Sequence, residues 1–129
     1  MDNKPIRVLL IEDNEQNRYL FSFILEKNGY RVIVAPDGLE GINKAKEEKP
    51  DLILVDIMLP VMDGYEVTRR LRDLSEFKDV PIIALTAYAM TGDREKALQA
   101  GCDGYIPKPI IPDEFIKMVN SYLRGKEKK

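Results

Sequence analysis

Short, dense runs of apolar residues recur along the chain and predict five β-strands. The first, third and fourth runs are close to uniformly apolar, which is typical of parallel strands covered on both faces by other elements. The fifth run is weaker than the others. The expected strands are Ile6 to Ile11, Arg31 to Ala35, Asp51 to Val55, Pro81 to Leu85 and Gly104 to Ile106.

The segments between these runs have the periodicity of helices. In the first of them, Asn14 is suited to the N-cap, and Gly29 to the left-handed position just beyond the C-terminus. In the last, Pro112 suits the first helical position, and Asp113 and Glu114 complement the helix dipole. The expected helices are Glu15 to Asn28, Leu39 to Glu48, Tyr65 to Asp73, Thr91 to Ala100, and Pro112 to about Leu123.

Strand and helix alternate through five units, and this order predicts the α/β class, with a parallel sheet and right-handed crossovers. The 129 residues fit one domain, residues 1–129, with a core from about residue 5 to about residue 124. We expect the charged tail, residues 125–129, to be frayed. Because the chain starts at Met1 and ends in this tail, we also expect a stand-alone protein rather than a fragment.

Composition excludes several classes of function. The 20 Lys and Arg residues nearly balance the 22 Asp and Glu residues, for a net charge of −2, which argues against a nucleic-acid partner. The chain contains no histidine, so it has no Ser-His-Asp or Cys-His pair and no His-ligated zinc. The single cysteine, Cys102, fits a reducing compartment, and no apolar run is long enough for a signal peptide or membrane span. We therefore expect a cytoplasmic protein that does not associate with membranes.

Polar side chains follow four of the five expected strands. Glu12 and Asp13 come after the first strand, Asp56 after the third, Thr86 after the fourth and Lys108 after the fifth. Since the carboxyl ends of parallel strands share one edge of the sheet, where ligands bind, we expect these groups to converge. Clustered carboxylates repel one another unless a proton or a cation joins them, and such oxygen ligands suit Mg²⁺. A nucleophilic carboxylate, a metal and nearby donors are what phosphoryl transfer requires.

With these residues in this order, the sequence resembles the receiver domain of two-component response regulators from Ile6 to about Leu123. The resemblance implies a flavodoxin-like, doubly wound sheet of five parallel strands in the order 2-1-3-4-5, with five helices in a three-layer αβα arrangement. For the metal site, Glu12 and Asp13 match the acidic pair that holds Mg²⁺ or Mn²⁺, Asp56 matches the phosphoacceptor and third ligand, and Met58 matches the residue whose backbone carbonyl completes the site. Pro60, Asp63 and Gly64 match the loop that follows the phosphoacceptor. Thr86 matches the switch hydroxyl, Tyr105 the switch aromatic, and Lys108-Pro109 the lysine with its cis-proline.

The resemblance also implies a mechanism. Asp56 takes a phosphoryl group from a phosphohistidine in a Mg²⁺-dependent reaction, and Lys108 and Thr86 then bind the aspartyl phosphate. Tyr105 moves from an exposed to a buried position, which repacks the face made by the fourth helix, fifth strand and fifth helix. A downstream protein target reads this face. Because the chain lacks histidine, the phosphohistidine must belong to a sensor histidine kinase or a histidine phosphotransfer protein.

The resemblance further implies a switch, not an enzyme with a turned-over substrate, in the form of a monomer or a weak phosphorylation-dependent dimer. The bulky residues Met58 and Tyr88 flank the site in this comparison, and they favour slow autodephosphorylation, since neither is suited to position water.

Other functions stay open to different degrees. An aspartate-nucleophile phosphatase would carry a second Asp two residues after Asp56, where this chain has Met58. In a flavin mononucleotide binder, a phosphate would meet the repulsive pair Glu12 and Asp13. That pair is also explained as acids near a helix N-terminus, and Tyr105 as a packing residue. The main alternatives are a phosphorylation-independent pseudo-receiver that acts as an interaction module, and a receiver fragment of a larger regulator or hybrid kinase.

Overall fold

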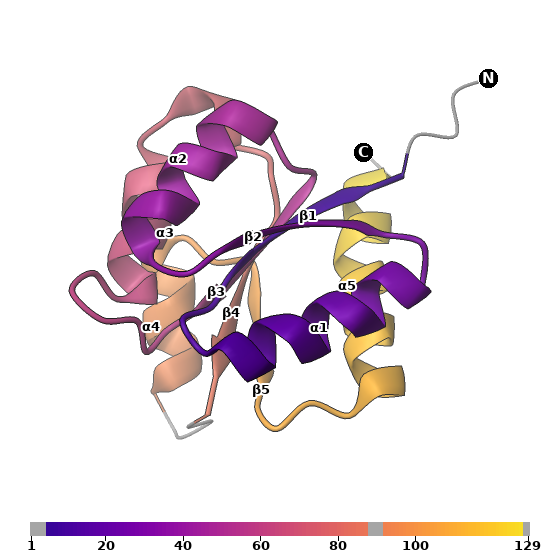
Figure 1. Ribbon diagram of the computed structural model, residues 1–129. Coiled ribbons are helices and arrows are strands. Elements are labelled where there is room, and N and C mark those ends of the chain that lie inside the picture. Colours follow the sequence, from indigo (N-terminus) through magenta and orange to yellow (C-terminus); the bar gives the residue numbers. More distant parts are fainter. Residues whose placement is uncertain (1–4, 88–91, 128–129) are drawn as a thin grey trace.

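The computed structural model describes residues 5–87 and 92–127, and its centre is a five-stranded parallel sheet (Figure 1). The strands lie in the order β2-β1-β3-β4-β5, which confirms the expected topology. The strands are β1 (Arg7–Ile11), β2 (Arg31–Ala35), β3 (Leu52–Asp56), β4 (Ile82–Thr86) and β5 (Gly104–Pro107), and the helices are α1 (Glu15–Lys27), α2 (Gly38–Glu48), α3 (Gly64–Arg72), the 3-10 turn η1 (Ser75–Phe77), α4 (Asp93–Ala100) and α5 (Pro112–Glu127).

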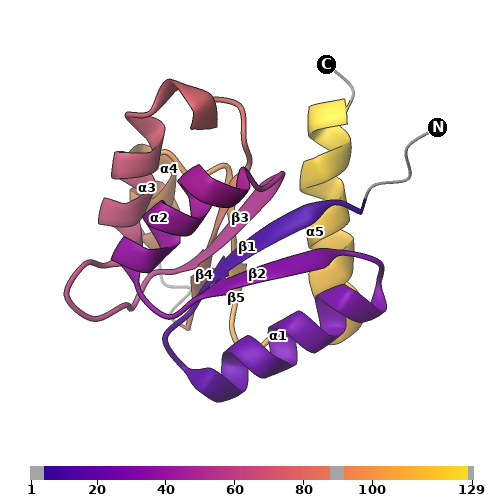
Figure 2. The ribbon, with the colours of Figure 1, turned by 45° about the horizontal axis from the view of Figure 1, so that its top comes forward.

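The helices form a layer on each side of the sheet. Helices α1 and α5 cover one face, and α2, α3 and α4 cover the other, as the two views in Figure 1 and Figure 2 show. In β1, Val8 and Leu10 belong to the core beneath α1 and α5, whereas Leu9 and Ile11 belong to the core on the other face. All four side chains are buried. Strand β1 is therefore apolar throughout because each of its faces is covered, as its uniform sequence predicts.

Side-chain caps set the beginnings of the first three helices. Asn14 accepts a hydrogen bond from the backbone N–H of Asn17 at 2.8 Å, as its N-cap position predicts. Asp37 and Asp63 play the same part for α2 and α3, each accepting a backbone N–H three residues later. These two helices therefore begin one residue earlier than expected. Beyond α1, Gly29 adopts a φ of +90°, the left-handed conformation predicted for it.

The C-terminal part of the chain differs from the expectation. Helix α5 continues through Glu127, past Gly125, where the sequence predicted a frayed tail. Lys128 and Lys129 lie outside the described residues, as does Thr91, the expected start of the fourth helix. Helix α4 is described from Asp93 onwards. Over residues 5–87 and 92–127, none of the helices combines the length and the apolar character needed to cross a membrane.

Candidate functional site

Parallel pairing brings the polar strand ends together at one edge of the sheet. Asp56 is the last residue of β3 and Thr86 the last of β4, while Glu12 and Lys108 directly follow β1 and β5. The backbone N–H of Glu12 continues the ladder by donating to the carbonyl of Ala35 at 3.0 Å. Four strands thus deliver these groups to one rim, as the sequence predicts.

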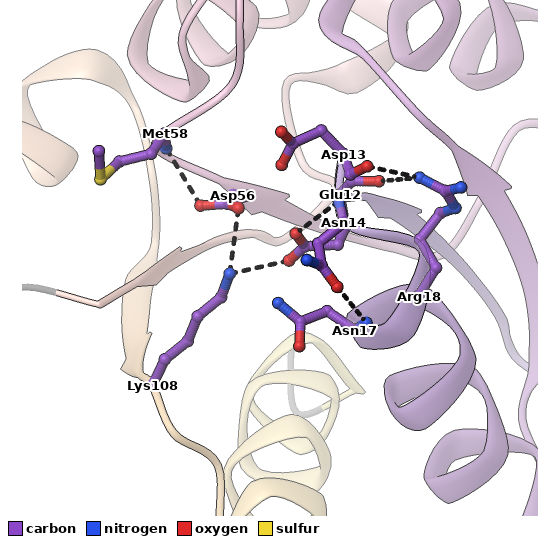
Figure 3. A network of polar contacts seen from close by, with 8 residues as sticks. All are labelled: Glu12, Asp13, Asn14, Asn17, Arg18, Asp56, Met58 and Lys108. Atoms are coloured by element: carbon purple, nitrogen blue, oxygen red, sulfur yellow. Dashed lines mark hydrogen bonds and ion pairs between the residues drawn. The ribbon is translucent and has the colours of Figure 1, made fainter.

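Lys108 lies between two buried carboxylates (Figure 3). Its Nζ is 2.9 Å from Oε1 of Glu12 and 3.0 Å from Oδ2 of Asp56. The side chains of Glu12 and Asp56 are only 1% and 7% exposed. Burial of charge at this level is tolerated when the charges are paired and hydrogen-bonded, and Lys108 supplies the pairing for both acids.

The remaining oxygen of each buried carboxylate accepts a backbone hydrogen bond. The N–H of Asn14 donates to Oε2 of Glu12 at 3.2 Å, and the N–H of Met58 donates to Oδ1 of Asp56 at 3.0 Å. Every oxygen of the two acids therefore has a donor, one from Lys108 and one from the loop that follows its own strand. Such donors fix the orientation of both carboxylates before any ligand arrives.

Burial and pairing shift the ionisation of this cluster in opposite directions. Burial raises the pKa of Glu12, and the hydrogen bond from Lys108 offsets this only in part, while the charge of Asp56 raises it further. Burial by itself lowers the pKa of Lys108, but its hydrogen bonds to Glu12 and Asp56 outweigh that effect and leave the pKa above its ordinary value. Lys108 is therefore a fixed positive charge at neutral pH.

Three acids at this rim are close enough to share one cation. Glu12, Asp13 and Asp56 each offer a carboxylate oxygen, and these oxygens all lie within 4.8 Å of one another. Asp13 is exposed whereas the other two are buried, so the cluster opens to solvent on the side of Asp13. Carboxylate oxygens with room for water are the donor set that Mg²⁺ prefers, so the residues present fit this ion.

One residue of the site carried no signal in the sequence. The guanidinium of Arg18, on α1, donates to the backbone carbonyls of Glu12 at 2.8 Å and Asp13 at 3.0 Å (Figure 3). These bonds go to the main chain, so they hold the acidic loop without neutralising its carboxylates directly. A lone arginine within a helix is ordinarily a solvated surface residue, and only the folded loop shows which carbonyls it reaches.

Thr86 and Lys108 are joined through the main chain. The carbonyl of Thr86 accepts a hydrogen bond from the N–H of Lys108 at 2.7 Å, and Thr86 itself is buried. The Lys108–Pro109 peptide bond is cis. The structure thus places Thr86, the expected switch residue, and Lys108, the expected lysine, at the ends of adjacent strands on one rim.

The other expected residues lie around this centre. Tyr105 is half-buried on β5 and packs against the core that includes α4. Met58 is 59% exposed, and its N–H donates to Asp56; the expected role of its carbonyl stays a prediction. Tyr88 lies outside the described residues.

Comparison with known proteins identifies the family of proteins that carries this arrangement of residues. The family model of the response regulator receiver domain matches residues 8–120. The chain belongs to this family. The receiver is 48% identical over 119 residues to the polar-differentiation response regulator DivK of Brucella anthropi, covering 92% of this chain and 97% of that relative.

Solved structures agree with the family assignment. The chemotaxis protein CheY4 of Vibrio cholerae is 30% identical, with a TM-score of 0.89 over 92% of this receiver and 99% of that chain. The receiver domain of the sensor histidine kinase PA1611 of Pseudomonas aeruginosa is 40% identical, with a TM-score of 0.86 over 93% and 98% of the two chains. That structure holds a magnesium ion coordinated in its active-site cleft. The present chain is therefore a receiver domain of the response regulator family, with an acidic cluster that could hold a metal ion.

Proposed function

We propose that Asp56 is the phosphoacceptor of this receiver. The observation that carries the proposal is the setting of its carboxylate, which the Met58 N–H and the Lys108 ammonium hold in place at the rim of the sheet. In the proposed step, a carboxylate oxygen of Asp56 forms a bond to phosphorus as the P–N bond of a partner's phosphohistidine breaks. The donor imidazole leaves with the electron pair of that bond and takes up a proton.

The proposed metal ligands are Glu12, Asp13 and Asp56, with the backbone carbonyl of Met58. Their support is the acidic cluster within 4.8 Å and the fit of its oxygen donors to Mg²⁺ or Mn²⁺. When bound, the divalent ion supplies positive charge that stabilises the negative oxygens of the phosphoryl group. Lys108 adds a second positive charge beside Asp56, and we assign it the role of binding a phosphoryl oxygen.

We further propose that Thr86 and Tyr105 transmit the phosphorylated state to the face made by α4, β5 and α5. The carbonyl of Thr86 accepts a hydrogen bond from the N–H of Lys108, and Tyr105 packs beside α4. Helix α5 also lies close to β5, since a Cβ added at Gly104 would clash with the hydroxyl of Tyr122. A dianionic phosphoryl group at the rim would therefore be connected, through residues in contact, to the surface that a downstream protein binds.

The cellular setting completes the proposal. The phosphodonor is a sensor histidine kinase or a histidine phosphotransfer protein, and the output is a protein target rather than nucleic acid or membrane. The chain acts in the cytoplasm as one receiver domain, a monomer or a weak phosphorylation-dependent dimer. Its only chemistry is its own phosphorylation and a slow loss of the phosphoryl group, which the exposed apolar side chain of Met58 favours because it does not position water.

The decisive experiment is incubation with acetyl phosphate and Mg²⁺, followed by intact-mass measurement. Wild-type protein should gain one phosphoryl group, and Asp56→Asn should gain none. Asp63→Asn is the matched control, since Asp63 is exposed and asparagine caps a helix as well as aspartate does. If the wild type gains nothing even with its histidine kinase, the pseudo-receiver alternative holds instead. Loss of the phosphoryl group within seconds would contradict the proposed slow autodephosphorylation.

The metal assignment has a separate test. Titration of Mg²⁺ by calorimetry should show binding to the wild type and at least a tenfold loss of affinity in Asp13→Asn, because one of three carboxylate ligands becomes neutral. Asp51→Asn serves as a control at the opposite end of β3. Unchanged affinity in Asp13→Asn would remove Asp13 from the site.

A further inference from the structure

Lys108 has a third contact besides its two carboxylates. Its Nζ lies over the ring of Phe21, 5.9 Å from the ring centroid. Phe21 belongs to α1 and is 2% exposed. The ammonium therefore has carboxylates on one side and the face of an aromatic ring on another, and nothing in the proposed phosphoryl transfer so far requires that ring.

An aromatic face does more for an ammonium than an aliphatic wall of the same size. The face of the ring is the negative side of its quadrupole, so it attracts a cation, and the attraction grows when both groups are withdrawn from water. Lysine carries its charge on a flexible four-carbon stem. A buried ring restricts that stem to positions where the ammonium lies over the ring face, and these positions coincide here with the Glu12 and Asp56 oxygens.

The ring is itself supported from the neighbouring helix. Phe115, at the start of α5, stacks on Phe21 with ring centroids 5.7 Å apart and an interplanar angle of 30°. Phe115 is 1% exposed, and both residues belong to the core beneath α1 and α5. These helices cover the same face of the sheet (Figure 2). The orientation of the Phe21 ring is thus fixed by packing between two helices.

Metal binding makes this contact more important. A cation held by Glu12 and Asp56 draws on the same carboxylate charge that pairs with Lys108 in the metal-free protein. The ion pairs between these carboxylates and the Lys108 ammonium are therefore weaker when the cation is bound. The ring of Phe21 provides no metal ligand, so its contact with the ammonium is not weakened in this way. Of the three contacts described, the ring contact is the one that a metal does not compete for.

We propose that Phe21 is a positioning residue for phosphoryl transfer, whose ring face holds the Lys108 ammonium at the reaction site while Phe115 fixes the ring. The inference rests on the proposed function, because it assumes that Lys108 binds a phosphoryl oxygen. In this role Phe21 does not act on the acceptor carboxylate or the phosphoryl group itself. It acts through Lys108, so its loss should lower the maximal rate and leave the Mg²⁺ affinity unchanged.

Two kinds of variant separate the ring's charge distribution from its bulk. Phe21→Leu should slow phosphorylation by acetyl phosphate at saturating Mg²⁺ about threefold to tenfold. Phe77→Leu is the matched control, a phenylalanine 1% exposed in the core on the other face of the sheet, and it should leave the rate unchanged. Because either change can weaken the fold, fluorinated phenylalanine at position 21 provides a second series. Fluorine withdraws charge from the ring face at nearly constant volume, so the rate should fall stepwise from phenylalanine to its monofluoro and trifluoro forms.

The wild-type chain also allows a test that does not depend on phosphorylation. Protons on the ε-carbon of Lys108 should resonate upfield in spectra of protein labelled at lysine, because this carbon is bonded to the Nζ that lies over the Phe21 ring. This shift should disappear in Phe21→Leu and persist in Phe77→Leu. Ordinary Lys108 resonances in the wild type, or a rate that is insensitive to fluorination, would overturn the inference. The proposed function fails independently, through phosphoryl uptake by Asp56→Asn.

Discussion

Replacing Lys108 by methionine tests whether the acidic rim is balanced as the structure indicates. The lysine ammonium is the one cation bonded to both Glu12 and Asp56 among the described residues, at 2.9 and 3.0 Å. Methionine keeps an unbranched apolar side chain of similar length, so packing over Phe21 is largely retained while the charge is lost. The metal-free variant then holds two buried carboxylates without their cation.

Proton uptake by a carboxylate limits how much the free energy of unfolding can fall in this variant. Breaking a buried ion pair by removing one partner costs about 3–5 kcal/mol. Protonation of Glu12 removes one buried charge and so reduces this destabilisation, and it is favoured because burial already raises the pKa of Glu12 above the ordinary value of 4.5. Keeping one such carboxyl protonated near pH 7 costs about 3.4 kcal/mol, at about 1.36 kcal/mol per pH unit, and near pH 5 only about 0.7 kcal/mol. We expect the metal-free variant to lose about 3 kcal/mol near pH 7.

The sign of the pH dependence follows from the raised carboxyl pKa. A group with a higher pKa in the folded state contributes stability that is present below the unfolded pKa and is lost as the pH rises through the folded pKa. The loss relative to the wild type should therefore grow from about pH 5 to about pH 7. Urea unfolding in the presence of a chelator measures it, and adding Mg²⁺ should stabilise Lys108→Met more than the wild type.

A matched control uses the same substitution on the surface. Lys49 pairs with Glu76 at 3.0 Å, the distance of the Lys108–Asp56 pair, but the two side chains are 70% and 45% exposed. Lys49→Met should cost at most about 1 kcal/mol, with little pH dependence. Lys108→Met could instead lose no more stability than Lys49→Met, or lose the same amount at about pH 5 and about pH 7. Either result would show that the two buried carboxylates do not depend on Lys108 for their charge balance.

Three further substitutions test other parts of the structure by urea unfolding. Arg72→Leu should lose about 2 kcal/mol of stability, because charged hydrogen bonds to backbone carbonyls are lost. The Arg72 side chain is largely buried and donates to the carbonyl of Gly101. No loss would mean that water replaces these bonds fully. Val61→Gly should gain about 1 kcal/mol, because a left-handed backbone strains valine but not glycine. Val61 is fully exposed and has a positive φ, so a decrease in stability would contradict the inferred strain. Gly64→Ala should lose about 2 kcal/mol and slow phosphoryl uptake, because overpacking forces the backbone to shift. The new Cβ would press on the carbonyl oxygen of Asp56, and normal uptake would show that this loop adjusts freely.

Much of the fold could be predicted because its signals are local. The uniformly apolar β1, β3 and β4 require cover on both faces, and Asn14 and Gly29 mark the ends of α1 through their own backbone preferences. The chain order of the polar strand ends then placed Glu12, Asp56 and Lys108 at one rim, since all strands run in parallel. The resemblance added the strand order, which periodicity does not specify.

The less predictable features have no local pattern in the sequence that indicates them. Helix α5 passes Gly125, where local propensity favoured an end, and the sequence carried no sign of this. Arg18 reaches the carbonyls of the acidic loop only because α1 begins directly after it. Arg72 bonds the carbonyl of Gly101 across the gap between α3 and α4. Such bonds depend on the relative placement of packed elements, which no local pattern encodes.

The sequence by itself determined which chemical groups this receiver has and on which edge of the sheet they gather, because alternating strands and helices admit one parallel arrangement of strand ends. Only the tertiary structure decided how those groups share their bonds. It placed the Lys108 ammonium between Glu12 and Asp56, 96 and 52 residues away in the chain, and laid it over the ring of Phe21. Such close approach between distant residues arises when both layers of helices pack on the sheet, and the balance of charge at the site exists only after that packing.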